Sequence, residues 1–321
     1  TKQDRLMNTL KKFAKGEPFD ISWAQLLAES AAEVPDKTCL LYNDERFTYR
    51  EMNANANRIG HYLQGIGGGR GSGLGIIMRN SPRFLDLFFG SQKIGMYTVP
   101  INPELKGDGL AYIVNHSDIR NLVVDAELLG QVVDNLDRFE HLSTENIIVN
   151  DIEEEARGIE IPPGMRRLSD AYSQPATDPG IAHNPHDLCL IIYTSGTTGS
   201  PKAVMLSHGN LLSNVLSIVD YLDLTADDVF LHLAPLSFDA STFEIWGALL
   251  NGGRLVLDQG AAHILEKIVL PAITTRLASR DDNFKLAKAN SQMRLEGRAL
   301  DRLWVATQGN LRQINLIMER A

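Results

Sequence analysis

The chain has 321 residues, of which 44% are hydrophobic and 22% are charged, and its formal net charge is −9. This length allows two ordinary domains or one large one, and the composition is that of a globular protein rather than a disordered one. The negative charge argues against general nucleic-acid binding, which needs a basic surface. No segment approaches the roughly 20 apolar residues that span a bilayer, and the polar N-terminus lacks an apolar signal core. We therefore expect a cytoplasmic protein without a membrane span.

Cysteine usage and charge distribution add two constraints. Cys39 and Cys189 are the only cysteines, which suits a reducing compartment and supplies no disulfide or zinc framework. Residues 261–321 hold ten Lys/Arg and six Asp/Glu, a net of +4, which leaves −13 for residues 1–260. The composition therefore changes near residue 260.

Helical and strand patterns alternate along the first part of the chain. Residues 21–35 read as an amphipathic helix ended by Pro35, and residues 38–52 as a β-hairpin around a polar turn. The glycine-dense stretch 67–81 does not complete G-x-G-x-x-G in any frame, which favours a plain connection between helix and strand. Alternation of this kind is typical of a parallel α/β sheet. Further helices are predicted at 53–67, 82–95 and 108–118, and further strands at 74–78, 96–105 and 120–125.

The middle of the chain leads into a second run of elements. Residues 151–185 are acidic and proline-rich, so we expect a surface excursion there. The apolar run 188–192 predicts a buried central strand, and 203–206 a second short strand. Ser207 can then cap a helix, because apolar residues follow it at helical spacing.

The segment "TSGTTGSPK" at 194–202 has the composition of a polyphosphate-binding loop. Its glycines let backbone N–H groups approach an anion closely, and its hydroxyls add donors. Lys202 adds a mobile positive charge. The loop is not of the Walker A type, because Pro201 precedes the lysine and Ala203 follows it. The alternative is a Gly/Ser/Thr turn without a ligand.

At this point the sequence resembles a known family. The segment "YTSGTTGSPKAV" closely resembles the phosphate-binding signature of the AMP-forming acyl-CoA synthetases and the adenylation domains of nonribosomal peptide synthetases, a superfamily that includes firefly luciferase. Ala203 departs from the glycine that is usual after the lysine. Three further motifs resemble the family in the family's order, and the resemblance runs from about residue 20 to residue 257. They are "FTYREMNANANRIGHYL", "SQKIGMYTVPINPELKGDGLAYIVNHSD" and "APLSFDASTFEIWGALLNGGRLVL".

The resemblance implies a fold and a division of the chain. Residues 1–257 would form a truncated large N-terminal domain of an AMP-dependent synthetase or ligase. That domain is α/β, with mostly parallel sheets and helices on both faces. Residues 258–321 do not resemble the family, and their pattern predicts a basic helical tail.

The resemblance also implies an activity and the residues that perform it. Members of the family join a carboxylate to AMP from Mg²⁺-bound ATP and pass the acyl group to the thiol of coenzyme A or of a carrier-protein pantetheine. Lys202 would assist catalysis, and Mg²⁺ would arrive with ATP, so no metal ligand is assigned within the chain. The residues that would hold the β- and γ-phosphates are Thr194, Ser195, Gly196, Thr197, Thr198 and Gly199.

The segment "SFDAST" bears on the acyl substrate. By resemblance to amino-acid-activating members, Asp239 would pair with a substrate ammonium, and Ala240 and Phe243 would line the pocket. The alternative is an aspartate or serine that only caps the following helix. The stretch 99–118 looks more like an acyl-CoA ligase, so the substrate stays open between a carboxylic acid and an amino acid. We expect His232 to be packed and Glu244 to serve structure.

The family's later motifs for adenine, ribose, the hinge and the C-terminal lysine are not found in this sequence. The expectation is therefore little or no adenylating activity for this chain alone, with a protein partner supplying the remaining parts. The alternative is a non-catalytic descendant that binds a nucleotide, an acyl ligand or a protein. Carboxylate-dependent exchange of pyrophosphate into ATP distinguishes the two.

Overall fold

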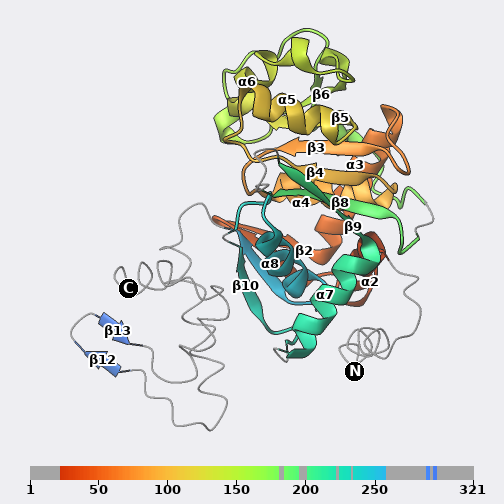
Figure 1. The fold of residues 1–321 in the computed structure, drawn as a ribbon. Helices are drawn as coiled ribbons and strands as arrows, with labels where there is room; N and C mark the ends of the chain where they lie inside the picture. Colours follow the sequence, from red (N-terminus) through yellow and green to blue (C-terminus); the bar gives the residue numbers. More distant parts are fainter. Residues whose placement is uncertain are drawn as a thin grey trace.

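A computed structural model describes residues 22–180, 184–194, 201–221, 224–232, 234–257, 287–289 and 292–294. Within these residues the chain forms a seven-stranded sheet, a four-stranded sheet and a separate two-stranded hairpin (Figure 1). Helices pack against the two larger sheets, so the predicted α/β class is confirmed. None of the described helices combines the length and apolar character that a bilayer crossing demands.

The larger sheet has the strand order β7-β6-β5-β3-β4-β8-β9. Every neighbouring pair is parallel except β8 and β9, which form an antiparallel hairpin. Every residue of β3 and β4 is buried, as expected for parallel strands covered on both faces. The strands are β3 (Gly73–Ile77), β4 (Tyr97–Pro100), β5 (Ile119–Asp125), β6 (Ile147–Asn150), β7 (Arg166–Arg167), β8 (Leu188–Thr194) and β9 (Lys202–Ser207).

The connections of this sheet create a point where the winding reverses. Helix α4 (Pro82–Lys93) leads from β3 to β4, and α5 (Gly107–His116) leads from β4 back to β5 on the other side of β3. Strands β4-β3-β5-β6-β7 therefore follow the doubly wound order 2-1-3-4-5. Open α/β sheets bind ligands in the crevice beyond the carboxyl ends of the strands at such a reversal. Here that crevice lies between β3 and β5.

Helices form a layer on each face of the larger sheet (Figure 1). Helices α3 (Tyr49–Gly65) and α4 lie between the two sheets, and α5 and α6 (Leu129–Val133) cover the outer face. The core between the sheets includes Trp246, whose ring lies 5.0 Å from that of Trp23 and 4.8 Å from that of Phe88, measured between centroids. Aromatic rings at these separations gain contact energy beyond their buried area.

The smaller sheet has the order β10-β11-β1-β2, with β2 antiparallel and the other pairs parallel. Its strands are β1 (Thr38–Tyr42), β2 (Glu45–Thr48), β10 (Val229–His232) and β11 (Arg254–Leu257). The remaining α-helices are α2 (Trp23–Glu33), α7 (His208–Tyr221) and α8 (Asp239–Leu249). Short 3₁₀ helices occur at Ala126–Leu128, Leu136–Arg138, Thr144–Asn146, Glu154–Ala156 and Leu168–Ser173.

Several local predictions are confirmed in detail. Ser207 accepts a hydrogen bond from the backbone N–H of Asn210 at 3.2 Å, as the predicted N-cap of α7 requires. Asn43, in the turn of the first hairpin, has a φ of 52°, a left-handed conformation that asparagine tolerates. The hairpin ends at residue 48 rather than 52, because Thr48 caps α3 in a capping box with Glu51.

Other elements differ from the prediction. No helix or strand was predicted from the sequence for residues 126–146, where the structure has α6 and three 3₁₀ turns. The predicted helical tail is wrong at β12 (Ala287–Ala289) and β13 (Gln292–Arg294), which pair as antiparallel strands. Asn290 and Ser291 separate these strands in the sequence, and both are poor helix formers. The rest of the predicted tail lies outside the described residues.

Candidate functional site

The predicted phosphate loop connects the two strands of the β8–β9 hairpin. Thr194 ends β8 and lies opposite Lys202, which begins β9. Both residues are exposed, so the lysine ammonium can reach a ligand in solvent. Five predicted loop residues lie outside the described residues, namely Ser195, Gly196, Thr197, Thr198 and Gly199.

Helix α5 holds both arms of this hairpin. The Tyr112 hydroxyl donates to the Pro201 carbonyl at 3.3 Å, next to Lys202. His116 Nδ1 lies 2.8 Å from the Tyr193 hydroxyl, next to Thr194. The rings of Tyr112 and His116 stack at 5.1 Å. The backbone on each side of the loop is therefore tied to one helix on the outer face of the sheet.

The predicted acyl-binding residues lie at the start of α8. Asp239 is its first residue and is exposed, and its Oδ1 accepts the backbone N–H of Ala240 at 2.8 Å. The N-cap position belongs to Phe238, which is 54% exposed and makes no side-chain cap. The Asp239 carboxylate is therefore open to solvent. Phe243, one turn further on, packs edge-on against Phe230 with centroids 5.6 Å apart.

A buried polar pair lies beneath this turn. His232 is fully buried at the end of β10, and its Nδ1 lies 2.8 Å from Oε2 of Glu244 on α8. The same oxygen accepts the backbone N–H of Ala234 at 3.0 Å. The expectations that His232 is packed and that Glu244 serves structure are confirmed. The residue types alone did not indicate that the two side chains are partners.

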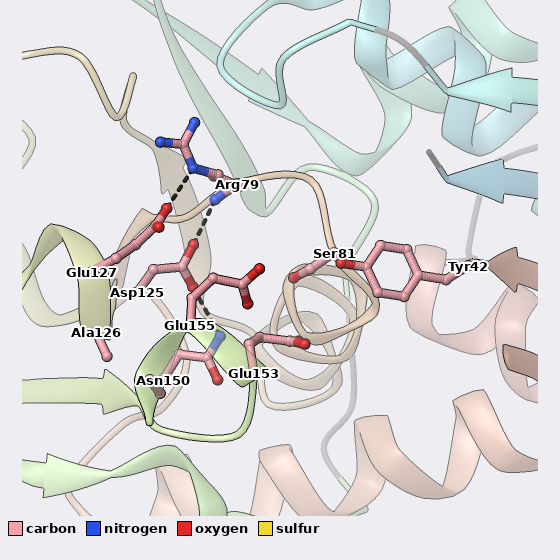
Figure 2. Close-up of a pocket in the computed structure, with 10 residues that line it drawn as sticks. Tyr42, Arg79, Ser81, Asp125, Ala126, Glu127, Asn150, Glu153 and Glu155 are labelled. Atoms are coloured by element: carbon pink, nitrogen blue, oxygen red, sulfur yellow. Dashed lines mark hydrogen bonds and ion pairs between the residues drawn. The ribbon is translucent and has the colours of Figure 1, made fainter. Parts of the chain in front are cut away.

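A cavity of about 150 Å³ occupies the crevice at the reversal point of the larger sheet. Figure 2 shows side chains at the carboxyl ends of β1, β3, β5 and β6 converging on it. No sequence pattern was taken to predict this cavity. A usable signal was that each of three strands has a polar residue at, or within two residues beyond, its carboxyl end. The lining residues are Tyr42, Arg79, Ser81, Asp125, Ala126, Glu127, Asn150, Glu153, Glu155 and Ala156.

Asp125 holds the ends of three strands together at this cavity. Its carboxylate accepts the Arg79 backbone N–H at 2.8 Å and the Asn150 Nδ2–H at 2.8 Å. Burial raises the pKa of Asp125, and these two hydrogen bonds oppose that shift. Arg79 is the only basic side chain in the lining, and it is paired with Glu127.

The charge of the cavity decides which ligands it suits. Four carboxylates line it, against the guanidinium of Arg79 in the lining and that of Arg83, which lies 3.8 Å from Glu153, so its field is electronegative. A polyphosphate would be repelled there, although the strand order alone would point to this crevice. Lys202, beside the predicted loop, is an exposed cation outside this electronegative cavity.

The cavity rim and the start of α8 are in contact. Asn80 lies between the lining residues Arg79 and Ser81, and its Nδ2 donates to the Ala234 carbonyl at 3.0 Å. The carboxyl ends of the two sheets therefore meet at Ala234. By contrast, no hydrogen bond or ion pair joins Lys202 to Asp239 among the residues that the structure describes.

The described residues offer neither a metal cluster nor a reactive thiol. No group of three or more His, Cys, Asp or Glu side chains within them could hold a metal ion. Cys39 and Cys189 are buried, and burial raises the pKa of both thiols. A buried thiol of raised pKa is a poor nucleophile at neutral pH.

Comparisons with known proteins agree with the fold. The family described as AMP-binding enzyme matches residues 27–276. Bacitracin synthase 1 of Bacillus licheniformis is 34% identical over 260 residues, and bacitracin synthase 3 of the same organism is 35% identical over 255 residues. Each match covers 79% of this chain but 4% of the relative, so the chain spans a small part of these proteins.

A solved structure has a similar fold. The crystal structure of the anthranilate CoA ligase AuaEII in complex with anthranoyl-AMP superposes with a TM-score of 0.70 and 29% sequence identity. The match covers 82% of this chain and 49% of that chain.

Proposed function

The chain belongs to the AMP-binding enzyme family, and on that premise we propose that it supplies phosphate-binding and acyl-binding residues for the ATP-dependent activation of an amino acid. In this reaction a carboxylate oxygen attacks the α-phosphorus of ATP, and an acyl–AMP anhydride forms. Pyrophosphate leaves with the electron pair of the broken P–O bond. The protein must position two anions and neutralise their charge.

The observation that carries the proposal is the placement of Lys202 opposite Thr194 at the base of the predicted loop. An exposed ammonium on a strand end can approach phosphate oxygens as a mobile point charge. Thr194 adds a hydroxyl donor on the facing strand. The ties from α5 to Tyr193 and Pro201 fix the two arms that carry these groups.

The exposed Asp239 supports an amino acid as the substrate. An exposed carboxylate in the first turn of α8 can pair with the ammonium group of a ligand. Relatives at 34–35% identity are named as synthases of the peptide bacitracin, and the ligand of the similar solved ligase is the adenylate of an aminobenzoate. Both fit a substrate that carries an amine as well as a carboxylate.

The reaction also needs Mg²⁺ and a thiol acceptor. Mg²⁺ is usually held by substrate phosphates and few protein ligands. Bound with ATP, it would neutralise phosphate charge beside Lys202. The acyl acceptor, coenzyme A or a pantetheine thiol, remains a prediction from the family resemblance.

The test is exchange of labelled pyrophosphate into ATP, driven by amino acids and by their deaminated analogues. We expect little exchange from this chain alone, and what exchange occurs should be greater with an amino acid such as phenylalanine than with 3-phenylpropionate; Asp239→Asn should remove the difference. Amino-acid binding without exchange would favour the non-catalytic alternative. Exchange that ignores the amine would contradict an amino-acid site.

A further inference from the structure

We propose that Glu244 is a positioning residue for the acyl site, which it serves by fixing the backbone segment that delivers Asp239. The effect on substrate binding rests on the proposed function, but the hydrogen bonds of Glu244 do not depend on it. Glu244 lies five residues beyond Asp239 on α8 and points away from the exposed face, with its side chain only 10% exposed. It does not touch the proposed ligand and would act through the backbone.

One oxygen of Glu244 holds two groups at once. Oε2 lies 2.8 Å from His232 Nδ1 and 3.0 Å from the Ala234 backbone nitrogen. Because a carboxylate only accepts, the Nδ1 of His232 donates in this contact. Bonds to an ionised acceptor are about twice as strong as neutral ones. The carboxylate thus joins the end of β10, the following backbone and α8 at one point.

A second anchor holds the other side of the same residue. The Ala234 carbonyl accepts the Asn80 Nδ2–H at 3.0 Å, from the connection between β3 and α4. The N–H of Ala234 is therefore held by the smaller sheet's own helix, and its carbonyl by the larger sheet. A residue fixed on both sides cannot rotate without breaking one of these bonds.

Hydrogen bonds carry this constraint forward to Asp239. The Phe238 N–H donates to the Pro235 carbonyl at 2.9 Å and closes a turn. The Ser241 hydroxyl donates to the Phe238 carbonyl at 2.6 Å and joins that turn to α8. The path from Glu244 to the exposed carboxylate is therefore short and bonded throughout. Moving Ala234 would move the turn and the first residue of α8.

The position of Glu244 favours this role over general stabilisation. Burying a carboxylate costs free energy that an apolar residue would not incur. The neighbouring residues of α8, Ile245 and Trp246, are apolar and already supply the core contacts. What only a carboxylate provides here is a charged acceptor for a backbone N–H at the entrance to the acyl site.

The test compares Glu244→Leu and Glu244→Gln with the wild type by amide hydrogen exchange across residues 234–242. Glutamine retains one acceptor oxygen, so it should rescue part of the effect. We expect the Ala234 amide to exchange about 10- to 100-fold faster in Glu244→Leu and by an intermediate factor in Glu244→Gln. The β3 and β5 amides should remain better protected than the Ala234 amide in both variants.

The matched control is Glu51→Gln, because Glu51 also accepts a backbone N–H, from Thr48 at 2.8 Å, but at the start of α3. It should leave residues 234–242 unchanged. Unchanged exchange at Ala234 in both Glu244 variants would overturn the proposal.

A second measurement separates this inference from the proposed function. If the chain binds amino acids, both Glu244 variants should weaken that binding while the affinity for Mg²⁺-ATP stays the same. A merely stabilising residue would move both affinities or neither. Suppose that Ala234 exchanges faster in the variants but that even the wild type binds no amino acid. The support of the Ala234 backbone by Glu244 would then stand, and the proposed amino-acid substrate would be wrong.

Discussion

Two regions present exposed polar residues in different ways: the β8–β9 hairpin with Lys202, and the start of α8 with Asp239. The hairpin is held by Tyr112 and His116, which are half-buried and exposed, respectively. The α8 turn is held by bonds to the buried Glu244. Hydrogen bonds exposed to water contribute less than charged ones removed from it. The β8–β9 hairpin is therefore held weakly, and the α8 turn firmly.

The largest effect on stability is expected from Glu244→Leu, which removes the hydrogen bonds that hold the α8 turn. The change leaves the His232 imidazole and the Ala234 N–H without their acceptor, and we expect a loss of about 3 kcal/mol in the free energy of unfolding. Urea titration measures this loss. The same substitution at exposed Glu51 removes only a helix cap and should cost about 1 kcal/mol. Equal losses at the two sites would contradict the contrast.

A second buried carboxylate checks the cost of burying charge. Burial raises the pKa of Asp86 on α4 to about 6, against opposing bonds from Arg83, Tyr172 and Asn55. A raised pKa means that the native state holds the proton more tightly than the unfolded chain. The unfolding free energy should therefore fall as pH rises from about 4 to about 6, by at most about 1.4 kcal/mol per pH unit from this group.

Asp86→Asn removes this titration. Urea unfolding at several pH values between 4 and 7 should give a less negative slope for the variant than for the wild type over that interval. Parallel curves for the two proteins would show that Asp86 does not titrate there.

Lys202→Ala tests the proposed phosphate-binding side chain and leaves the hydrogen bonds that hold the hairpin in place. We expect Mg²⁺-ATP to bind about tenfold more weakly, because one charged contact to a phosphate is lost, and the unfolding free energy to stay unchanged. Calorimetry and urea titration measure the two. Loss of stability would mean that the lysine has a structural role at the start of β9.

The smallest effect is expected from Tyr112→Phe, which weakens the hairpin support. Loss of the hydroxyl bond to Pro201 should cost about 0.5–1.5 kcal/mol. Tyr62→Phe is matched, because Tyr62 donates to the Arg167 carbonyl at 3.2 Å away from the hairpin. Similar stability losses are expected for both, with a twofold to threefold weaker ATP affinity, about 0.5 kcal/mol, in Tyr112→Phe alone. Equal affinities would show that the α5 contacts do not reach the phosphate site.

The sequence was sufficient for features that depend on neighbours along the chain. Ser207 and the helix after it, and the Asn43 turn between two strands, follow from local capping and turn chemistry. The apolar run 188–192 predicted a buried strand because its pattern is continuous. The resemblance of motifs in family order then predicted the α/β sheets.

Features that depend on distant partners were not predictable from one sequence. Asn80 and Ala234 are 154 residues apart, and Tyr112 and Pro201 are 89 apart, yet each pair is hydrogen-bonded. The strand at 203–206 was predicted, but its antiparallel pairing with β8 was not, because strand direction depends on how the hairpin folds back. Residue types predicted that Glu244 was structural, but only the fold identified what it holds.

The most direct measurement is calorimetric titration of the chain with Mg²⁺-ATP, in parallel with Lys202→Ala and with Lys106→Ala as a matched exposed lysine elsewhere. We predict binding at one site in the wild type, about tenfold weaker binding in Lys202→Ala and no change in Lys106→Ala. Binding that is equal in all three proteins, or absent from the wild type, would contradict a phosphate site at the β8–β9 hairpin.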